Sequence, residues 1–225
     1  MFYRYWCRKK SSCLKAHPDC ANSIIDAGFD VVGLANNHIL DFSEQGLKET
    51  LQVFKQAGIL TCGAGSNLFE AQKPILIEKQ GIKVAYIAIA EKEFSIARFD
   101  RAGAAPLETM DNTVQIENAS SIADLVFVTV HGGNEYYSFP RLGLRKICRY
   151  FIDRGADGVI CHHPHVAGAY EFYQDKPIVY ILGNLIFDHT KSPPCWNEGY
   201  ALRVDYDIEK MHLMSYENIP YTQSV

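Results

Sequence analysis

Three short apolar segments of this sequence each run directly into a polar loop that carries histidine. The segments and their loops are VVGLA (31–35) before Asn36-Asn37-His38, VFVTV (126–130) before His131, and GVIC (158–161) before His162-His163-Pro164-His165. Short apolar runs that alternate with amphipathic segments are typical of βα units and a parallel sheet. In open α/β sheets ligands bind at the carboxyl ends of the strands, so the sequence predicts that these loops present imidazole rings to one place.

Helices are predicted between the apolar segments. One covers 21–27 and stops at Gly28, one begins where Ser43 can act as its N-cap and ends at Gly58, and one covers 143–154. Further strands are predicted over 83–90, 124–130, 177–182, 200–206 and 211–216, with loops and one irregular helix between 91 and 121. The first residues are basic, and we expect an N-terminal extension over 1–20. The sequence shows no internal repeat or linker, which predicts a single domain over 21–225.

Composition excludes several classes of protein. The 225 residues carry a formal net charge of -4, whereas a nucleic-acid-binding chain normally shows a basic excess. No window of about 18 apolar residues is present, so no transmembrane helix is predicted, and the first residues lack the apolar core of a secretory signal. The seven cysteines are scattered without a C-x-x-C pair. Most are predicted to be free thiols, which favours a cytoplasmic location.

His163 and His165 lie two residues apart around a proline. On an extended or turning backbone such residues point to the same side, so both rings can reach one metal ion or two adjacent ions. The alternative is a pair of surface histidines that only form hydrogen bonds. Asn37, His38 and Asp41 form a second polar cluster, in which the amide oxygen can bind a hard metal and the carboxylate can fix the imidazole of a general acid. The alternative there is an asparagine that caps a turn.

His131 follows a predicted strand and precedes two glycines and Glu135. Glycines remove side chains where a ligand or a second loop approaches closely, and a nearby carboxylate can orient a metal-binding histidine from the second shell of ligands. The alternative is a flexible turn with a solvated acid. The sequence leaves both interpretations open.

Five ordered stretches of this sequence resemble one known family, the bacterial capsule-synthesis or poly-γ-glutamate biosynthesis proteins, whose fold is related to that of calcineurin-like metallophosphoesterases. The stretches are AGFDVVGLANNHILDFSEQGLKETLQVFKQAGI, GAGSNLFEA, VTVHGGNEYY, GADGVICHHPHVAGAYEFY and KPIVYILGNLIFD. The resemblance implies a layered α/β sandwich of the metallophosphatase type. Relatives open with a strand that ends in Gly-Asp and an Asn-Leu-Glu segment, and neither pattern precedes Asn37 here, so we expect the first strand or strands to be missing.

The resemblance also implies roles for particular residues. His38 resembles the catalytic histidine, and Asn37, His131, His163 and His165 resemble the metal ligands. The residues expected to support them are Asp41, Glu135, His162, Glu171 and Asn184. The implied cofactors are divalent ions of manganese, iron or zinc. Because the matched ligands are neutral and carboxylates normally bridge and balance two dications, we expect one ion, or weak binding of a second.

The implied ligand is a phosphoester or a compound related to poly-γ-glutamate, and the implied partners belong to a capsule-synthesis machinery. The expected reaction is metal-dependent hydrolysis of a phosphoester. The alternatives are a non-catalytic component that binds or assembles poly-γ-glutamate, and an inactive remnant, since a fold alone does not determine function. If a membrane anchor preceded this chain, the protein would lie at the cell surface rather than in the cytoplasm.

Overall fold

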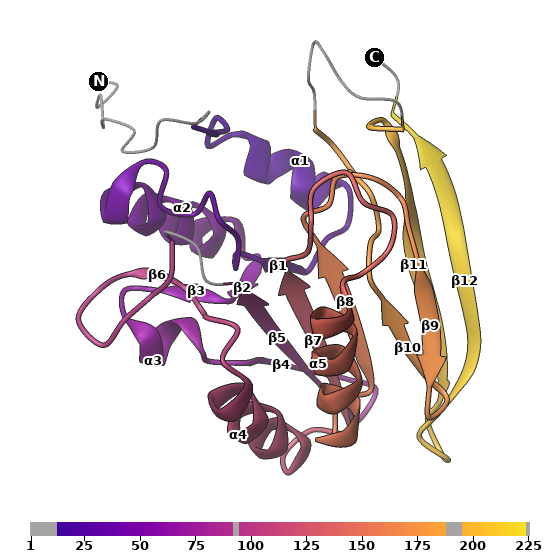
Figure 1. The fold of residues 1–225 in the computed structure, drawn as a ribbon. Coiled ribbons are helices and arrows are strands. Elements are labelled where there is room, and N and C mark those ends of the chain that lie inside the picture. The colour runs from indigo at the N-terminus through magenta and orange to yellow at the C-terminus, as the bar shows by residue number, and fades with distance from the viewer. Residues whose placement is uncertain (1–12, 92–94, 188–194, 224–225) are drawn as a thin grey trace. The chain divides into compact units, whose positions relative to one another are not determined.

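The computed structural model describes residues 13–91, 95–187 and 195–223 (Figure 1). Two compact units form, one from Met1–Ile75 and Tyr86–Glu108 and the other from Leu76–Ala85 and Thr109–Val225. Most of the predicted basic extension, residues 1–12, lies outside the described residues. Among the described residues no helix combines the length and the apolar character that a membrane span requires.

The first unit is built around short strands and three helices. Strand β1 (Val31–Gly33) pairs in parallel with β2 (Leu60–Cys62), and β3 (Ala64–Gly65) pairs antiparallel with β6 (Gly103–Ala104). The helices are α1 (Cys20–Asp26), α2 (Ser43–Ala57) and the single-turn α3 (Leu68–Ala71). Strand β1 leads directly into the Asn36–Asp41 loop, so the predicted order of strand and polar loop is confirmed here.

Helix α2 fixes the far side of that loop. Leu47 is buried to 1% exposure, and Leu51 and Phe54 pack beside it because the three share one helical face. Gly58 ends the helix at φ 76°, a left-handed conformation that glycine adopts at little cost. The predicted role of Ser43 is wrong: Ser43 is the first helical residue, Phe42 takes the capping position, and none of the described side chains caps the helix.

The second unit contains a sheet of six strands in the order β4-β5-β7-β8-β10-β9. Their bounds are β4 (Ile75–Lys79), β5 (Ile82–Ala90), β7 (Leu125–His131), β8 (Gly158–His162), β9 (Tyr170–Tyr173) and β10 (Lys176–Val179). Strands β7, β8 and β10 run parallel, and β9 lies antiparallel at the edge. The carboxyl-terminal half of β5 belongs to the first unit.

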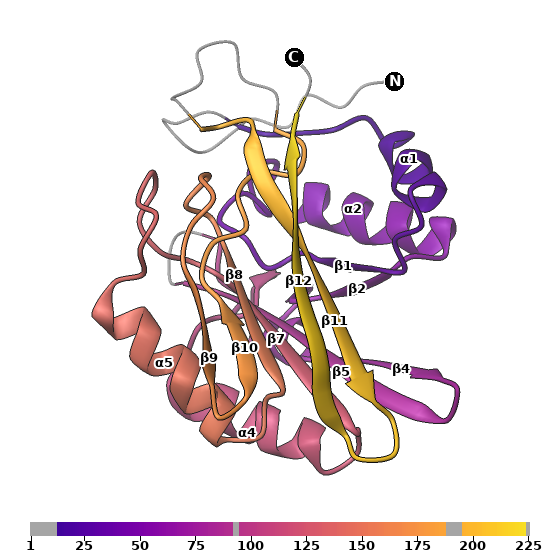
Figure 2. The same ribbon diagram turned by 90° about the vertical axis from the view of Figure 1, so that its right-hand side faces the viewer.

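Helices and a hairpin cover opposite faces of this sheet. Helices α4 (Thr109–Ser120) and α5 (Leu142–Asp153) pack on β7 and β8, where Cys148 of α5 meets Cys161 with 3.6 Å between the sulfurs. Phe127 is the register partner of Gly158, an odd number of residues from Cys161, so its ring lies on the other face. There it meets Tyr206 of the long hairpin β11 (Glu198–Asp207) and β12 (His212–Thr222), at 5.9 Å between ring centroids (Figure 2).

The fold is therefore a mixed α/β fold with a mostly parallel central sheet, as predicted. The predicted strands and the helices beginning near 21, 43 and 143 are all present, and the main difference in length is β12, which continues to Thr222 instead of ending at 216. Residues 109–120 form a regular helix where an irregular one was predicted. The elements that sequence analysis did not predict are β2, β3, β4, β6, β9 and α3, each of five residues or fewer.

Candidate metal centre

Parallel pairing of β7 and β8 brings the histidine loops of the second unit together. His131, the last residue of β7, is the register partner of His162, the last residue of β8. The amide of Gly132 then donates to the carbonyl oxygen of His162 at 2.9 Å, which ties the two loops where the strands end. The predicted convergence of these loops at one edge of the sheet is thus a consequence of strand register.

The backbone around Pro164 adopts conformations that residues other than glycine rarely take. His163 has φ 109° and His165 has φ 63°, both in the positive region. Such residues cost on the order of 1–3 kcal/mol each and persist only where the surroundings enforce them. The amide of Tyr136 donates to the carbonyl oxygen of Pro164 at 2.8 Å, and a Cβ on Gly133 would lie only 3.2 Å from the Pro164 ring. The neighbouring loop therefore holds the strained turn in place.

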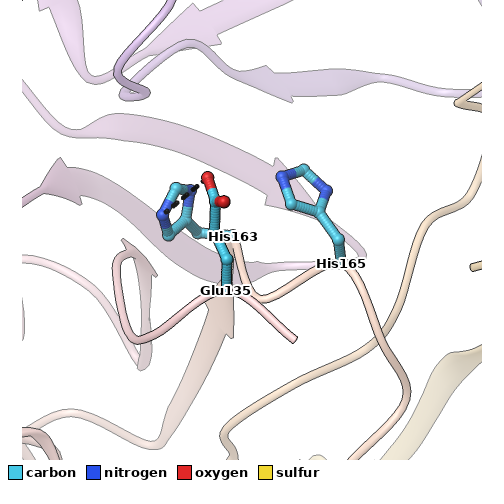
Figure 3. A group of neighbouring side chains, drawn as sticks. All are labelled: Glu135, His163 and His165. Carbon is cyan, nitrogen blue, oxygen red and sulfur yellow. Dashed lines mark ion pairs between the residues drawn. The ribbon is translucent and has the colours of Figure 1, made fainter. Parts of the chain in front are cut away.

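This turn directs two imidazoles toward a carboxylate. The ligand atoms of Glu135, His163 and His165 all lie within 4.8 Å of one another, a spacing suited to one metal ion (Figure 3). Oε1 of Glu135 is 3.9 Å from Nε2 of His163, too long for a hydrogen bond but short enough for both atoms to reach one ion. Glu135 was predicted to orient a histidine, which stays a prediction, and its position also suits direct ligation.

Asn184 and Trp196 fix the ring of His165. Nδ1 of His165 lies 2.8 Å from Oδ1 of Asn184, while Nδ2 of Asn184 donates to the carbonyl oxygens of His165 and Trp196. The two donations assign the amide orientation, so its oxygen must accept and the proton must reside on Nδ1 of His165. The indole of Trp196 stacks on the imidazole at 4.9 Å and 22°. The contact with Asn184 leaves Nε2 of His165 as the nitrogen that faces a metal ion.

The two remaining histidines of these loops have different surroundings. The centroids of the His131 and His163 rings are 4.9 Å apart, so His131 lies beside the Glu135–His163–His165 group. It is not one of the three residues whose ligand atoms all lie within 4.8 Å of one another. Burial lowers the pKa of His162 from 6.5 to about 4, which keeps this ring neutral near pH 7. The predicted roles of His131 as a ligand and His162 as a supporting residue stay predictions.

The Asn36–Asp41 loop of the first unit contains a histidine–carboxylate pair. Nδ1 of His38 lies 2.7 Å from Oδ2 of Asp41, a carboxylate that is 1% exposed and also accepts from the amide of Leu14. Because a carboxylate only accepts, Nδ1 of His38 carries a proton and Nε2 is the nitrogen left for chemistry. The predicted support of His38 by Asp41 has a direct geometric basis.

Two hydrogen bonds shape the backbone of the same loop. Oδ1 of Asn36 accepts from the amide of His38 at 2.8 Å, which closes a local turn. The hydroxyl of buried Ser95 donates to the carbonyl oxygen of Asn37 at 2.7 Å from 58 residues away. Ser95 could not be identified from the sequence, because no local pattern marks a partner 58 residues away. That Asn37 and His38 act together with the histidines of the second unit stays a prediction.

Glu171 was expected to support the metal ligands, and the structure gives its carboxylate other partners. Arg149 binds it through Nε at 2.9 Å and Nη2 at 2.6 Å, Arg145 adds a contact at 3.2 Å, and the Tyr180 hydroxyl donates at 2.6 Å. The Arg149 hydrogen bonds, with smaller contributions from Tyr180 and Arg145, outweigh burial and lower the pKa of Glu171 from 4.5 to about 2. Glu171 therefore anchors α5 to β9, and its expected supporting role for the metal ligands stays a prediction.

The sequence resembles known proteins over most of its length. Residues 4–189 match the sequence profile described as "Bacterial capsule synthesis protein PGA_cap". The chain is 32% identical over 210 residues to "Capsule biosynthesis protein CapA" of Bacillus anthracis and 34% identical over 204 residues to "PGA biosynthesis protein CapA" of Bacillus subtilis (strain 168). These alignments cover 91% and 89% of this chain but 49% and 51% of the relatives. The chain thus spans about half the length of the curated relatives that it matches.

A solved structure resembles the chain in fold. The crystal structure of a hypothetical protein from Thermus thermophilus matches with a TM-score of 0.54 at 12% sequence identity. The match covers 90% of this chain and 80% of that chain. At this identity the likeness concerns the fold alone.

Proposed function

The chain belongs to the bacterial capsule synthesis protein family PGA_cap, and we propose that it serves poly-γ-glutamate capsule synthesis through a metal-dependent phosphoester site. One observation carries the proposal: the ligand atoms of Glu135, His163 and His165 lie within 4.8 Å of one another, and the two histidines lie on a strained turn that the loop of Glu135 holds in place. Backbone strain held by neighbouring hydrogen bonds is common where a site has to be preorganised, so the strained turn supports a functional role for these histidines.

The donor set fits a single divalent ion of manganese, iron or zinc. One carboxylate and two imidazoles, with His131 adjoining them, are the ligand types that these ions share. Hydrogen bonding from Nδ1 of His165 to Asn184 leaves Nε2 as the metal-binding nitrogen. When bound, the ion would polarise a phosphoryl oxygen and lower the pKa of a water molecule.

Charge favours one ion over two. Glu135 supplies a single negative charge to the group, and the other donors are neutral imidazoles. Two dications bring about four positive charges, which paired sites normally offset with bridging carboxylates. We therefore expect tight binding of one ion and weak binding of a second.

The His38–Asp41 pair is suited to proton transfer to the leaving group. Asp41 is buried and holds the proton of His38 on Nδ1, so a second proton on Nε2 can be donated to a departing oxygen. The resulting neutral imidazole keeps its orientation because the Nδ1–Asp41 hydrogen bond persists. In this role Asp41 positions the ring and does not itself touch the phosphoester.

A non-catalytic role is the second candidate. The group contains one carboxylate, and the chain spans about half the length of its curated relatives, so binding or assembly in the capsule machinery is compatible with both observations. The two candidates differ in one property, since only the first requires turnover that depends on His38.

Metal binding by matched variants tests the proposal. Isothermal titration of the purified chain with Mn²⁺ and Zn²⁺ should give one tight site, and Glu135→Gln or His163→Ala should weaken it at least about tenfold. Glu78→Gln and His212→Ala change the same residue types at exposed positions and should leave the affinity unchanged. Equal affinity in all five proteins would remove the metal centre from the proposal.

A further inference from the structure

Exposed apolar side chains lie on the β7–α5 loop and at the start of helix α5. Tyr137 is 65% exposed, Phe139 78% and Leu142 75%. Single exposed apolar residues are ordinary, but three within six residues of one loop and helix end form a patch that usually contacts something. Figure 1 shows this loop as the connection that rises from β7 and returns to the start of α5.

Basic side chains adjoin this patch. Arg145 and Lys146 follow Leu142 by three and four residues on α5, so they neighbour it on the helix surface. Residues 132–150 contain four basic residues and one acidic residue, although the whole chain has a net charge of -4. Residues 132–150 thus carry a net positive charge beside the exposed apolar side chains, whereas the whole chain is net negative.

The positive charge of this region exceeds the negative charge that pairs with it. Arg145 and Arg149 share the carboxylate of Glu171, which offsets one of their two charges. Lys146 forms no ion pair within the described part of the chain and its side chain is exposed. The surface formed by Tyr137, Phe139, Leu142, Arg145 and Lys146, here called the α5 entry surface, is therefore both apolar and positively charged.

We propose that the α5 entry surface docks the protein peripherally on an anionic lipid bilayer. Aromatic and aliphatic side chains at a loop tip can enter the boundary between headgroups and acyl chains, while neighbouring lysine and arginine contact anionic headgroups. A tyrosine beside a phenylalanine and a leucine suits this boundary, because its ring is apolar and its hydroxyl is polar. Charge complementarity selects an anionic bilayer over a neutral one.

This docking would place the candidate metal centre near the lipid surface. Glu135 lies two residues before Tyr137 in the same loop, and the amide of Tyr136 holds the turn that carries the two histidine ligands. The docking proposal does not depend on catalysis, and it holds or fails separately from the proposed function.

Vesicle cosedimentation tests the docking. The whole chain is mixed with vesicles of phosphatidylcholine and phosphatidylglycerol at about 3:1, and with phosphatidylcholine alone, at low and high salt. We expect binding to the anionic vesicles that weakens as salt rises, because each basic residue near the surface contributes about fivefold. Phe139→Ser with Leu142→Ser should reduce binding at least about tenfold. Lys146→Glu should reduce binding to anionic vesicles by a similar factor.

Two matched variants serve as controls. Phe99→Ser changes a residue that is 93% exposed in the first unit, and Lys48→Glu reverses a charge on α2. Both should bind vesicles like the unchanged chain, and far-ultraviolet circular dichroism should show every variant folded. Absence of vesicle binding, equal binding to neutral vesicles, or equal loss in the controls would each overturn the proposal. Sedimentation showing that Phe139 and Leu142 drive self-association in place of lipid binding would overturn it as well.

Discussion

Oδ1 of Asn184 lies 2.8 Å from Nδ1 of His165, and this contact determines which nitrogen of the imidazole carries the proton. The asparagine is 7% exposed, and its Nδ2 is held by the carbonyl oxygens of His165 and Trp196. A buried amide with all three contacts cannot rotate without losing at least one of them. The orientation of a candidate metal ligand therefore depends on a residue outside the ligand set.

Replacing Asn184 should weaken metal binding without removing a ligand. In Asn184→Ala the Nδ1 proton of His165 loses its acceptor, and the carbonyl oxygens of His165 and Trp196 lose a donor. We expect a loss of metal affinity of about 10- to 100-fold, the range for residues that orient ligands. Titration calorimetry with Zn²⁺ measures it, and Asn22→Ala on the exposed side of α1 is the control. Unchanged affinity in Asn184→Ala would show that His165 needs no partner.

Glu171 should make stability depend on acid pH. Its pKa is about 2 in the folded chain against 4.5 ordinarily, so its ion pairs stabilise the fold fully above about pH 4.5. That stabilisation is lost as the pH falls from about 4.5 toward 2, because the carboxylate must then be protonated. Glu171→Gln should lower the free energy of unfolding at pH 7 by on the order of 1–3 kcal/mol. Urea unfolding at several pH values should show the difference vanish near pH 2.

The control for Glu171 is another glutamate–arginine pair. Glu117 contacts Arg154 at 3.5 Å, but both side chains are about half exposed. Glu117→Gln should change the free energy of unfolding by less than about 1 kcal/mol at any pH, because water screens the pair. If Glu117→Gln and Glu171→Gln lower the free energy of unfolding by the same amount, burial and bidentate geometry do not strengthen the Glu171 contacts.

Ser95 should stabilise the loop that carries the His38–Asp41 pair. Its hydroxyl is buried and donates to the carbonyl oxygen of Asn37 at 2.7 Å. Ser95→Ala leaves that carbonyl without this donor and should destabilise the chain by about 1–3 kcal/mol. Hydrogen exchange should show faster exchange of the His38 amide in Ser95→Ala. The exposed Ser66→Ala is the control, and equal exchange rates in both variants would contradict the assignment.

Strand register explains why much of the second unit could be predicted from sequence. An apolar run that ends in histidine predicts both a buried strand and the sheet edge where the side chain emerges, and β7 and β8 confirm this for His131 and His162. The pair His163 and His165 was predicted to point to one side on an extended or turning backbone. The rings do converge, but through two positive φ angles that no periodicity encodes.

The contacts that sequence analysis missed are those set by tertiary packing. Glu171 matches a family stretch, yet its carboxylate faces Arg145 and Arg149 of α5, which only the packing of that helix on the sheet reveals. Glu135 was predicted to orient a histidine, because the sequence of a glycine-containing turn does not tell where the following carboxylate points. Trp196 stacks on His165 from 31 residues away, and no spacing in the sequence marks such a partner.

The charge of the donor set should limit catalysis by this chain. With one carboxylate in the group, a single ion should bind well and a second ion poorly. The phosphoryl oxygens of a bound ester would then contact one metal ion instead of two. We expect the isolated chain to hydrolyse a generic phosphomonoester or phosphodiester slowly with Mn²⁺ present. His38→Ala should remove most of that turnover and leave the Mn²⁺ affinity unchanged, because His38 acts on the leaving oxygen. The turnover rate of Asp41→Asn should lie between those of the unchanged chain and His38→Ala, since the amide oxygen still accepts from Nδ1 of His38 but carries no charge. Turnover that depends on neither Mn²⁺ nor His38 would rule out a phosphoesterase role for this chain and favour a binding role in the capsule machinery.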